Sequence, residues 1–439
     1  MILTAQFLWS LDGWIILAGL LCAIATASLG NFLVLRKMSL LGDAISHAVL
    51  PGLAIAFLVS QSRNSWVMFL GAIAAGVLTA LLSEWIHNAG KVDEGAALGV
   101  VFTSLFALGL VLIVRAADSV DLDADCVLYG AIELSPLDTV EIFGAHIPQA
   151  VVVLACVATI NVLFVAVCFK ELLITTFDPL LATTSGFRSR MMHYLLMILV
   201  AVTAVASFQT VGSVLVVAMM IVPPAAAYLL TERLSTMIWL SCLLGGLAAV
   251  TGHLAAVTVP SWFGLGSTST AGMIAVMAGL FFIGCWLLSP KQGVMISLIR
   301  RYTLAWRILC DDILALLYRV EERQLSISPN ISKLSDLLLA WRLAVWLACR
   351  RLSRHGLLDR SDDRYLLSDS GRQRAIPLVR SHRLWEEYLV SQLGLPTDRI
   401  HDKAELYEHY TSSQLRQDLS AETNAPEQDP HGSPIPPEN

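Results

Sequence analysis

The sequence predicts an all-α polytopic membrane protein with about eight or nine transmembrane helices, followed by a mainly α domain outside the membrane. Hydrophobic residues make up 56% of the 439 residues, charged residues only 15%, and the mean hydropathy is +0.67. A water-soluble domain carries nearer 25% charged residues, so most of this chain resides in lipid. Because charge returns near residue 300, we expect a transmembrane domain over 1–290, a winged-helix-like domain over 300–376, a helical segment over 377–418 and a disordered tail over 419–439.

The apolar stretches of the first domain are long enough to cross a bilayer. About 20 helical residues span roughly 30 Å of hydrocarbon. Proline removes a helical hydrogen bond, so Pro223 and Pro224 could divide the seventh stretch into two half-helices. The candidate stretches are 13–35, 43–60, 66–86, 94–115, 149–169, 191–209, 212–230, 236–257 and 270–289.

The loops between these stretches alternate in charge. Basic residues gather in every second loop, and the opposite loops are poor in them apart from Arg63. Since basic loops stay in the cytoplasm, these loops and the C-terminal domain are predicted to be cytoplasmic, with the N-terminus outside. The basic residues are Arg36, Lys37, Lys91, Lys170, Arg188, Arg190, Arg233 and Lys291.

A long loop on the opposite side, 116–148, carries acidic residues and no lysine or arginine. It is either a solvated loop or an acidic vestibule that concentrates cations or docks a partner. Its acidic residues are Asp118, Asp121, Asp123, Asp125, Glu133, Asp138 and Glu141.

One polar pair lies beside the apolar stretches, in SLLGDAISHAVLPG (39–52). Asp43 and His47 are four residues apart, so on a helix they share one face. Ionisable groups inside a membrane cost about 2.5–3.5 kcal/mol each and therefore usually face a cavity or a partner. A carboxylate with an imidazole is half of a site for a divalent cation. The alternative is structural, with Asp43 capping the helix and His47 bonding a nearby backbone group.

Five stretches together resemble the metal-type ABC permeases, the membrane subunits of bacterial manganese, zinc and iron importers. In that family the aspartate and histidine of the first motif line the translocation path, and they match Asp43 and His47. The resemblance implies a multi-pass protein of the bacterial inner membrane. Its partners would be an ABC ATPase subunit, a metal-binding solute-binding protein and a second permease protomer, identical or a sister chain. The stretches are GNFLVLRKMSLLGDAISHAVLPGLAIAFL (30–58), KVDEGAALGVVFTSLFALGLVL (91–112), DLDADCVLYG (121–130), FDPLLATTSG (177–186) and VGSVLVVAMMIVPPAAAYLLTERL (211–234).

The loop over 170–190 contains a short predicted helix. It starts at Asp178-Pro179 and ends at Gly186, residues that favour a helix start and a helix end. By the same resemblance Phe177, Asp178, Pro179 and Gly186 belong to the coupling helix that contacts the ATPase subunit; the alternative is an ordinary surface loop. The sequence has no G-x-x-x-x-G-K-[ST] phosphate loop. We therefore expect a transport subunit rather than an enzyme, with ATP hydrolysis supplied by a separate chain.

The C-terminal domain begins with the outline of a winged helix. An amphipathic segment over 308–322 precedes a helix-rich segment over 334–358 and a hairpin-like stretch over 359–375. A DNA reader presents polar side chains to base edges, whereas the helix in that position displays Trp341 and Trp346. Two interpretations stay open: a domain that binds DNA, and a metal sensor that has lost DNA binding.

Two groups of histidines and carboxylates follow. His382 and Glu386 are four residues apart, and Glu405, Glu408 and His409 share a face of the next predicted helix. Such clusters suit a first-row divalent cation; the alternative is a solvated, salt-bridged helix pair.

This region resembles the iron- and manganese-dependent repressor family over residues 311–416. The family's first-helix ligand matches Asp312, although Ala315 stands where a manganese-type member has a carboxylate. Glu405 stands where iron-type members have cysteine, and an oxygen ligand there favours a harder ion such as manganese over a thiophilic metal. Zinc and iron stay as the alternative metals. The resemblance implies metal ligands at His382, Glu386, His401, Glu405, Glu408, His409 and Asp312.

The sequence therefore predicts the permease subunit of an ATP-driven divalent metal importer with a cytoplasmic metal-sensing domain. The alternative is a membrane-anchored, metal-dependent transcriptional regulator whose apolar domain is only a platform. The tail over 419–439 is rich in proline and polar residues, and this composition predicts disorder.

Overall fold

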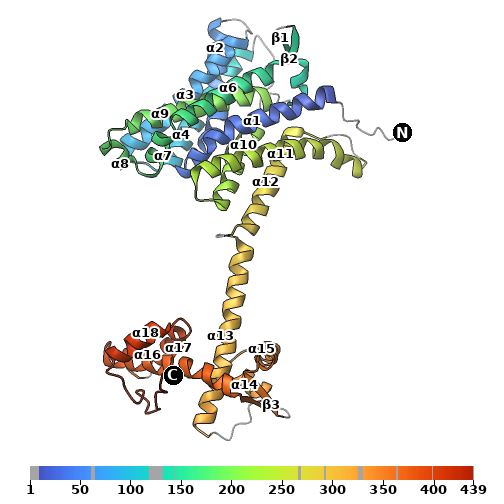
Figure 1. The fold of residues 1–439 in the computed structure, drawn as a ribbon. Helices are drawn as coiled ribbons and strands as arrows, with labels where there is room; N and C mark the ends of the chain where they lie inside the picture. The colour runs from blue at the N-terminus through green and yellow to red at the C-terminus, as the bar shows by residue number, and fades with distance from the viewer. Residues whose placement is uncertain are drawn as a thin grey trace. The chain divides into compact units, whose positions relative to one another are not determined.

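The computed structural model describes residues 9–60, 65–117, 132–142, 144–264, 268–290, 293–324, 330–361, 364–397 and 399–438. The chain divides into two compact units, Met1–Ile296 and Ser297–Asn439. Each unit buries its own hydrophobic core. Figure 1 shows the helices and strands of both units, coloured by residue number.

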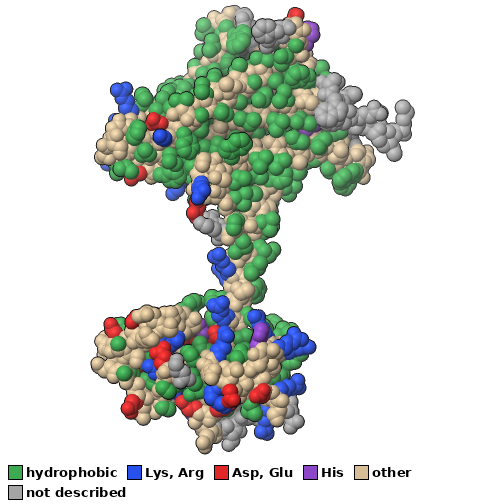
Figure 2. Space-filling view, in the orientation of Figure 1, with side chains coloured by type: hydrophobic (Ala, Val, Ile, Leu, Met, Phe, Trp, Pro, Cys, Tyr) green, Lys and Arg blue, Asp and Glu red, His purple; other side chains and the backbone are tan. Residues whose placement is uncertain are grey.

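The N-terminal unit is a bundle of long apolar helices. Among the described residues, nine helices are long and apolar enough to cross a membrane, which confirms the predicted polytopic fold. Pro223 and Pro224 lie inside α10, which continues as one helix through both. Hydrophobic side chains dominate the surface of this unit in Figure 2, as expected of a lipid-facing bundle. The nine helices are α1 (Trp9–Leu35), α2 (Leu41–Ser60), α3 (Ser65–Gly90), α4 (Glu94–Ala117), α6 (Gln149–Val167), α9 (Ser189–Val211), α10 (Ser213–Leu230), α11 (Leu234–Trp262) and α12 (Thr270–Leu288).

Shorter elements connect these helices. A 3-10 helix η1 (Ile132–Leu137) and an antiparallel hairpin, β1 (Thr139–Ile142) with β2 (Ala145–Pro148), precede α6, and Val140 pairs with Ile147. Two short helices, α7 (Phe169–Phe177) and α8 (Pro179–Thr184), lie between α6 and α9. The motif over 121–130 and the first four acidic residues of the loop over 116–148 lie outside the described residues.

Glycines bring α2 close to both α3 and α4. A Cβ atom on Gly52 would lie 2.2 Å from the carbonyl oxygen of Gly71 in α3. One on Gly109 of α4 would lie 2.8 Å from Cδ of Pro51. Because no side chain fits at either contact, the helices approach with their backbones nearly touching, as small residues allow in membrane bundles. These contacts hold α2, the helix that carries Asp43 and His47, against two neighbours.

The C-terminal unit has the helix–helix–helix–hairpin order of a winged helix. Ile313, Val345 and Leu367 come from three different elements of this part and pack in one core. Ser368 accepts a hydrogen bond from the amide of Gly371 and so caps the long helix that follows the hairpin. The elements of the unit are α13 (Val294–Glu322), α14 (Ile331–Leu337), α15 (Arg342–Arg354), β3 (Leu358–Ser361), β4 (Arg364–Leu367), α16 (Asp369–Ser391), α17 (His401–Glu408) and α18 (Ser413–Glu422).

Residues 419–438 of the tail are folded, whereas their composition predicts disorder. Helix α18 continues to Glu422, residues 428 and 434 form an antiparallel bridge, and Ile435 packs beside Leu384 and Leu419. Two arginines of α16 hold this stretch: Arg383 donates to the carbonyl of Pro434, and Arg380 donates to the carbonyl of Pro436 at 2.6 Å. The tail is ordered because side chains of another helix satisfy its backbone, a contribution that its own composition does not reveal.

Candidate metal centres

Asp43 and His47 lie together on α2 as the spacing predicts. Asp43 is in the first turn of the helix, and its Oδ1 atom is 3.7 Å from Nε2 of His47. The imidazole stands against two rings of α4, with centroids 6.1 Å from Phe102 and 5.8 Å from Phe106. Within one chain the side chains remain 47% and 34% exposed, so both can reach a ligand at the surface of α2. The alternative of a purely structural pair predicted a hydrogen bond from His47 to a backbone group. Among the described residues, His47 makes no such bond.

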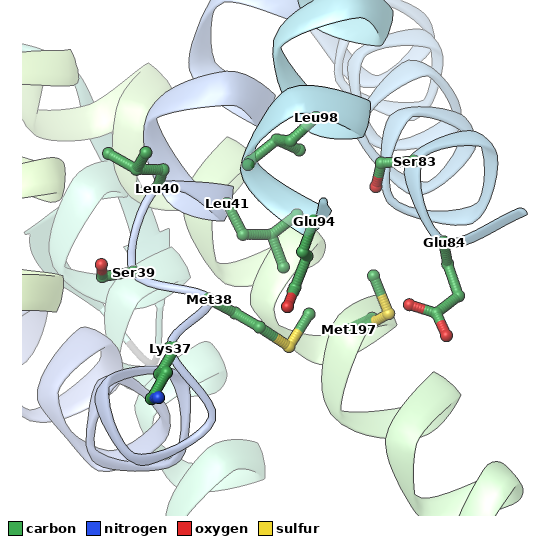
Figure 3. Close-up of a pocket in the computed structure, with 11 residues that line it drawn as sticks. Lys37, Met38, Ser39, Leu40, Leu41, Ser83, Glu84, Glu94, Leu98 and Met197 are labelled. Carbon is green, nitrogen blue, oxygen red and sulfur yellow. The ribbon is translucent and has the colours of Figure 1, made fainter. Parts of the chain in front are cut away.

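A small, partly open cavity lies beside the start of α2. Its wall includes residues 37–41, which precede and begin this helix, together with Leu98 of α4. Figure 3 shows the carboxylates of Glu84 and Glu94 and the thioethers of Met38 and Met197 around the space. The helix that carries the Asp43–His47 pair thus begins at a hollow with polar as well as apolar walls.

The predicted coupling segment forms the short helix α8. Asp178 is its N-cap, accepting a hydrogen bond at 2.9 Å from the amide of Leu181, and Pro179 follows at the first helical position. Gly186 has a φ of 87°, a value that favours glycine, and the chain turns there toward α9. The apolar side chains of Phe177, Leu180 and Leu181 are 62%, 81% and 55% exposed. An exposed apolar helix of this kind is suited to insertion in a groove of another protein.

Arg36, just after α1, connects α7, the helix that precedes α8, with α9. Its guanidinium donates to the hydroxyls of Thr175 and Thr176 in α7 at 3.1 and 3.2 Å. A third nitrogen lies 3.1 Å from Nδ1 of His193, whose Nε2 lies 3.1 Å from a carboxylate oxygen of Glu84. Only residue 178 separates α7, which Arg36 contacts, from α8.

The first cluster of the C-terminal unit contains His382, Glu386 and His401. One ligand atom from each lies within 4.8 Å of the others. His382 and Glu386 face the same way because they are one turn apart on the buried side of α16. Nε2 of His382 is 3.1 Å from both Oε1 of Glu386 and Nδ1 of His401, and His401 is 2.9 Å from the same oxygen. Two nitrogens and one oxygen therefore converge on one point.

The second cluster contains Asp312, Glu408 and His409. Asp312 belongs to α13, and its Oδ1 is 3.1 Å from Nε2 of His409; Oε1 of Glu408 is 3.7 Å from that nitrogen. The other oxygen of Glu408 lies 2.6 Å from Nδ1 of His382. That contact joins the first and second clusters into one continuous set of donors.

A third cluster contains Glu386, Asp429 and His431, two of which the sequence did not predict as ligands. Oε2 of Glu386 is 3.5 Å from Nδ1 of His431, while its Oε1 serves the first cluster. Asp429 accepts from the backbone amides of His431 and Ser433, which closes a tight loop over Glu386. The only signal in the sequence was a histidine two residues after an aspartate, in a stretch otherwise typical of disorder.

The structure does not bring Glu405 to any of the three clusters. Helix α17 turns Ala404 and Glu408 inward, and these two residues are 0% and 3% exposed. Glu405 comes one residue after Ala404, about 100° around the helix, and its side chain is exposed.

The clustered groups shift one another's proton affinities. Burial favours the neutral acid, but hydrogen bonds from His382 and His401 lower the pKa of Glu386 from 4.5 to about 2. Burial opposes the imidazolium of His382 as well, yet bonds to Glu386 and Glu408 raise its pKa above the ordinary value. Burial also opposes the charged form of His409, but the hydrogen bond to Asp312 favours it, and the pKa of His409 is raised. Negative carboxylates paired with nitrogen donors suit a divalent cation, which must displace protons from these histidines to bind.

Comparison with known proteins matches the two ends of the chain to two different families. The model of the ABC 3 transport family matches residues 13–288, and that of the iron dependent repressor, metal binding and dimerisation domain matches residues 368–437. The manganese transport system membrane protein MntD of Bacillus subtilis is 46% identical over 66% of this chain and 96% of its own length.

Two further similarities extend this result. A probable metal transport system membrane protein of Chlamydia trachomatis is 28% identical and aligns with 96% of this chain and 95% of its own length. The solved structure of PsaBC from Streptococcus pneumoniae in complex with Fab is similar with a TM-score of 0.52 and 34% identity. That similarity covers 64% of this chain and 92% of the other.

Proposed function

Because the chain belongs to the ABC 3 transport family, we propose that it is the membrane-spanning subunit of an ATP-driven importer of a divalent metal ion. The observation that carries this proposal is the pair Asp43 and His47, placed 3.7 Å apart on one face of α2. Manganese is the first candidate, because a relative that is 46% identical is a manganese transport protein, and zinc and iron are the alternatives. The protein acts in the bacterial inner membrane with its C-terminal unit in the cytoplasm, following the distribution of basic residues between the loops.

In this proposal the transported ion exchanges part of its hydration shell for protein ligands. One carboxylate and one imidazole from a single chain do not fill the coordination shell of such a cation. A second permease protomer, identical or a sister chain, supplies the matching face and completes the path. A solute-binding protein delivers the ion on the outer side.

The energy for transport comes from a separate ATPase subunit that docks on α8. The exposed Phe177, Leu180 and Leu181 enter the partner's groove, and the Asp178 cap keeps the short helix formed. Arg36 then passes the movement of α7 and α8 to α1 and α9, and so to the segment that leads into α2.

The C-terminal unit is proposed to sense metal that has entered the cytoplasm. The residues that would hold an ion are His382, Glu386 and His401, with Glu408, His409 and Asp312 beside them and Asp429 and His431 over them. A bound ion would supply positive charge to carboxylates that now lie within hydrogen-bond distance of histidine nitrogens. Its binding therefore links the tail, α13, α16 and α17 and provides a signal for feedback on transport.

The transport proposal is tested by uptake of radioactive manganese into proteoliposomes that hold the chain with its ATPase subunit and solute-binding protein. We expect Asp43→Asn and His47→Gln each to lower ATP-dependent uptake by about tenfold or more, since even outer-shell partners of a metal are worth 10–100-fold. His87→Gln, on a half-exposed histidine at the end of α3, is the matched control and leaves uptake unchanged. Unchanged uptake in both test variants would contradict the proposal and favour a membrane-anchored regulator.

A further inference from the structure

A second apolar surface lies on the C-terminal unit, at the turn between α14 and α15. Three of its side chains are among the most exposed apolar groups of the described chain: Leu339 is 92% exposed, Trp341 86% and Leu343 66%. Leu337 and Leu347 extend it at 53% and 42%. We call these five residues the α15 patch.

The α15 patch contributes nothing to the core of its own unit. Val345, Ala348, Cys349 and Leu352 form the inward side of α15 and are 0–5% exposed. Leu339 has a φ of 48°, in the left-handed region where a leucine is strained and asparagine or glycine is usual. The fold thus holds a large apolar side chain outward at a position where polar residues are normally found, and apolar patches of this kind mark binding surfaces.

Basic residues continue the same face. Leu343, Leu347, Arg350 and Arg354 follow at intervals of four, three and four residues, so they form one exposed stripe along α15. The guanidinium of Arg350 lies 5.2 Å from the centre of the Trp346 ring. No aspartate or glutamate occurs between residues 337 and 358. In Figure 2, lysine and arginine side chains gather on the side of the C-terminal unit where Figure 1 places α15.

From this arrangement we propose that the α15 patch docks on a lipid bilayer that contains anionic headgroups. Aliphatic and tryptophan side chains at one end of the helix enter the interface, and arginines at the other end meet lipid phosphates. Both halves of the stripe then have a partner. The C-terminal unit is also tethered to the bilayer, because it follows the membrane helix α12 in the same chain.

The same surface fits DNA poorly. In a helix-turn-helix the residues at the start of the recognition helix contact base edges with hydrogen-bonding side chains. Here that place is taken mainly by the apolar Leu339, Trp341 and Leu343, and the one arginine among them, Arg342, donates a hydrogen bond to Ser332. This inference concerns a surface of the C-terminal unit and does not depend on the transport activity proposed above.

The experiment measures hydrogen–deuterium exchange of residues 337–347 in the full chain, reconstituted in nanodiscs of phosphatidylglycerol with phosphatidylcholine, in nanodiscs of phosphatidylcholine alone, and in detergent. We expect exchange about tenfold slower in the anionic discs than in detergent, with an intermediate value in phosphatidylcholine. The triple variant Leu339→Ser, Trp341→Ser, Leu343→Ser abolishes the protection, and Arg350→Gln with Arg354→Gln removes its dependence on anionic lipid. Leu393→Ser, on a leucine that is 58% exposed elsewhere in the unit, leaves it unchanged.

Equal exchange in all three environments would overturn the proposal. Protection that arises only after adding the ATPase subunit, or only after adding duplex DNA, would also overturn it and assign the surface to that partner. A loss of folding in the triple variant is recognised by faster exchange in α16, and in that case the arginine variant and the comparison of lipids still decide the outcome.

Discussion

Glu386 is the residue on which the C-terminal clusters depend most, and Glu386→Gln is the change that tests them. Its two oxygens contact three histidines, His382, His401 and His431. The carboxylate is 3% exposed and its pKa falls from 4.5 to about 2, which corresponds to about 3 kcal/mol of stabilisation of the metal-free unit at neutral pH. Glutamine keeps the shape of the side chain but not its charge. We therefore expect Glu386→Gln to lower the free energy of local opening by up to about 3 kcal/mol.

The assay is hydrogen exchange of α16 amides in the metal-free full chain, together with manganese binding by equilibrium dialysis. If α16 amides exchange through local opening, a loss of about 3 kcal/mol speeds their exchange by roughly 100-fold. Removal of a ligand weakens manganese binding by more than about tenfold. The control is Glu405→Gln, an exposed glutamate of the adjacent helix. Glu405→Gln should change the exchange rate and the manganese affinity by about twofold or less, as surface substitutions usually do.

The pH dependence of the same variant has a definite sign. A carboxylate with a lowered pKa stabilises the folded unit above the unfolded-state value of 4.5 and loses that effect as the pH falls toward about 2. The difference in exchange between parent and Glu386→Gln is therefore full at pH 7 and shrinks as the pH is lowered through this interval. The reasoning is refuted if the difference does not change with pH, or if Glu405→Gln weakens manganese binding as much as Glu386→Gln.

Three other changes have expected outcomes. Asp178→Ala removes the cap of α8 at a cost of about 1 kcal/mol and should weaken binding of the ATPase subunit, measured by co-purification, while Asp178→Asn retains a capping oxygen and should restore it. Arg36→Gln should lower both uptake and the thermal unfolding temperature, and Arg36→Lys should fail to restore them, because lysine lacks the three-way geometry that contacts α7 and His193. Arg383→Met breaks a buried contact with Glu322 and Asp429, a change that typically costs about 3–5 kcal/mol, and should make residues 423–438 sensitive to limited proteolysis. Arg399→Met, on an exposed arginine, should leave proteolysis unchanged.

The parts of the fold that depend on local pattern could be predicted from the sequence. Apolar length predicted the membrane helices, and four-residue spacing placed Asp43 beside His47 and His382 beside Glu386. Spacing and the resemblance to the repressor family both suggested Glu405, but the side of α17 that faces inward is set by the packing of Ala404 and Glu408.

The tail could not be predicted for a related reason. Its order depends on Arg380 and Arg383, which lie about 50 residues earlier and bond its carbonyl groups. Composition within the segment carries no information about such a distant partner, so Asp429 and His431 were missed as members of the third cluster. Similarly, Pro223 and Pro224 break a helix in isolation, whereas packing in the bundle keeps α10 continuous.

The central claim, that the Asp43–His47 pair takes the place of water around a travelling ion, is tested most directly by pulsed electron paramagnetic resonance of Mn²⁺ held in the assembled transporter. For this measurement the histidines of the C-terminal unit are replaced by glutamine, so that imidazole signals come from the membrane unit alone. We predict a nitrogen hyperfine coupling from a directly bound imidazole that disappears in His47→Gln and persists in His193→Gln. A coupling that survives His47→Gln, or a manganese spectrum with water ligands only, would contradict the account.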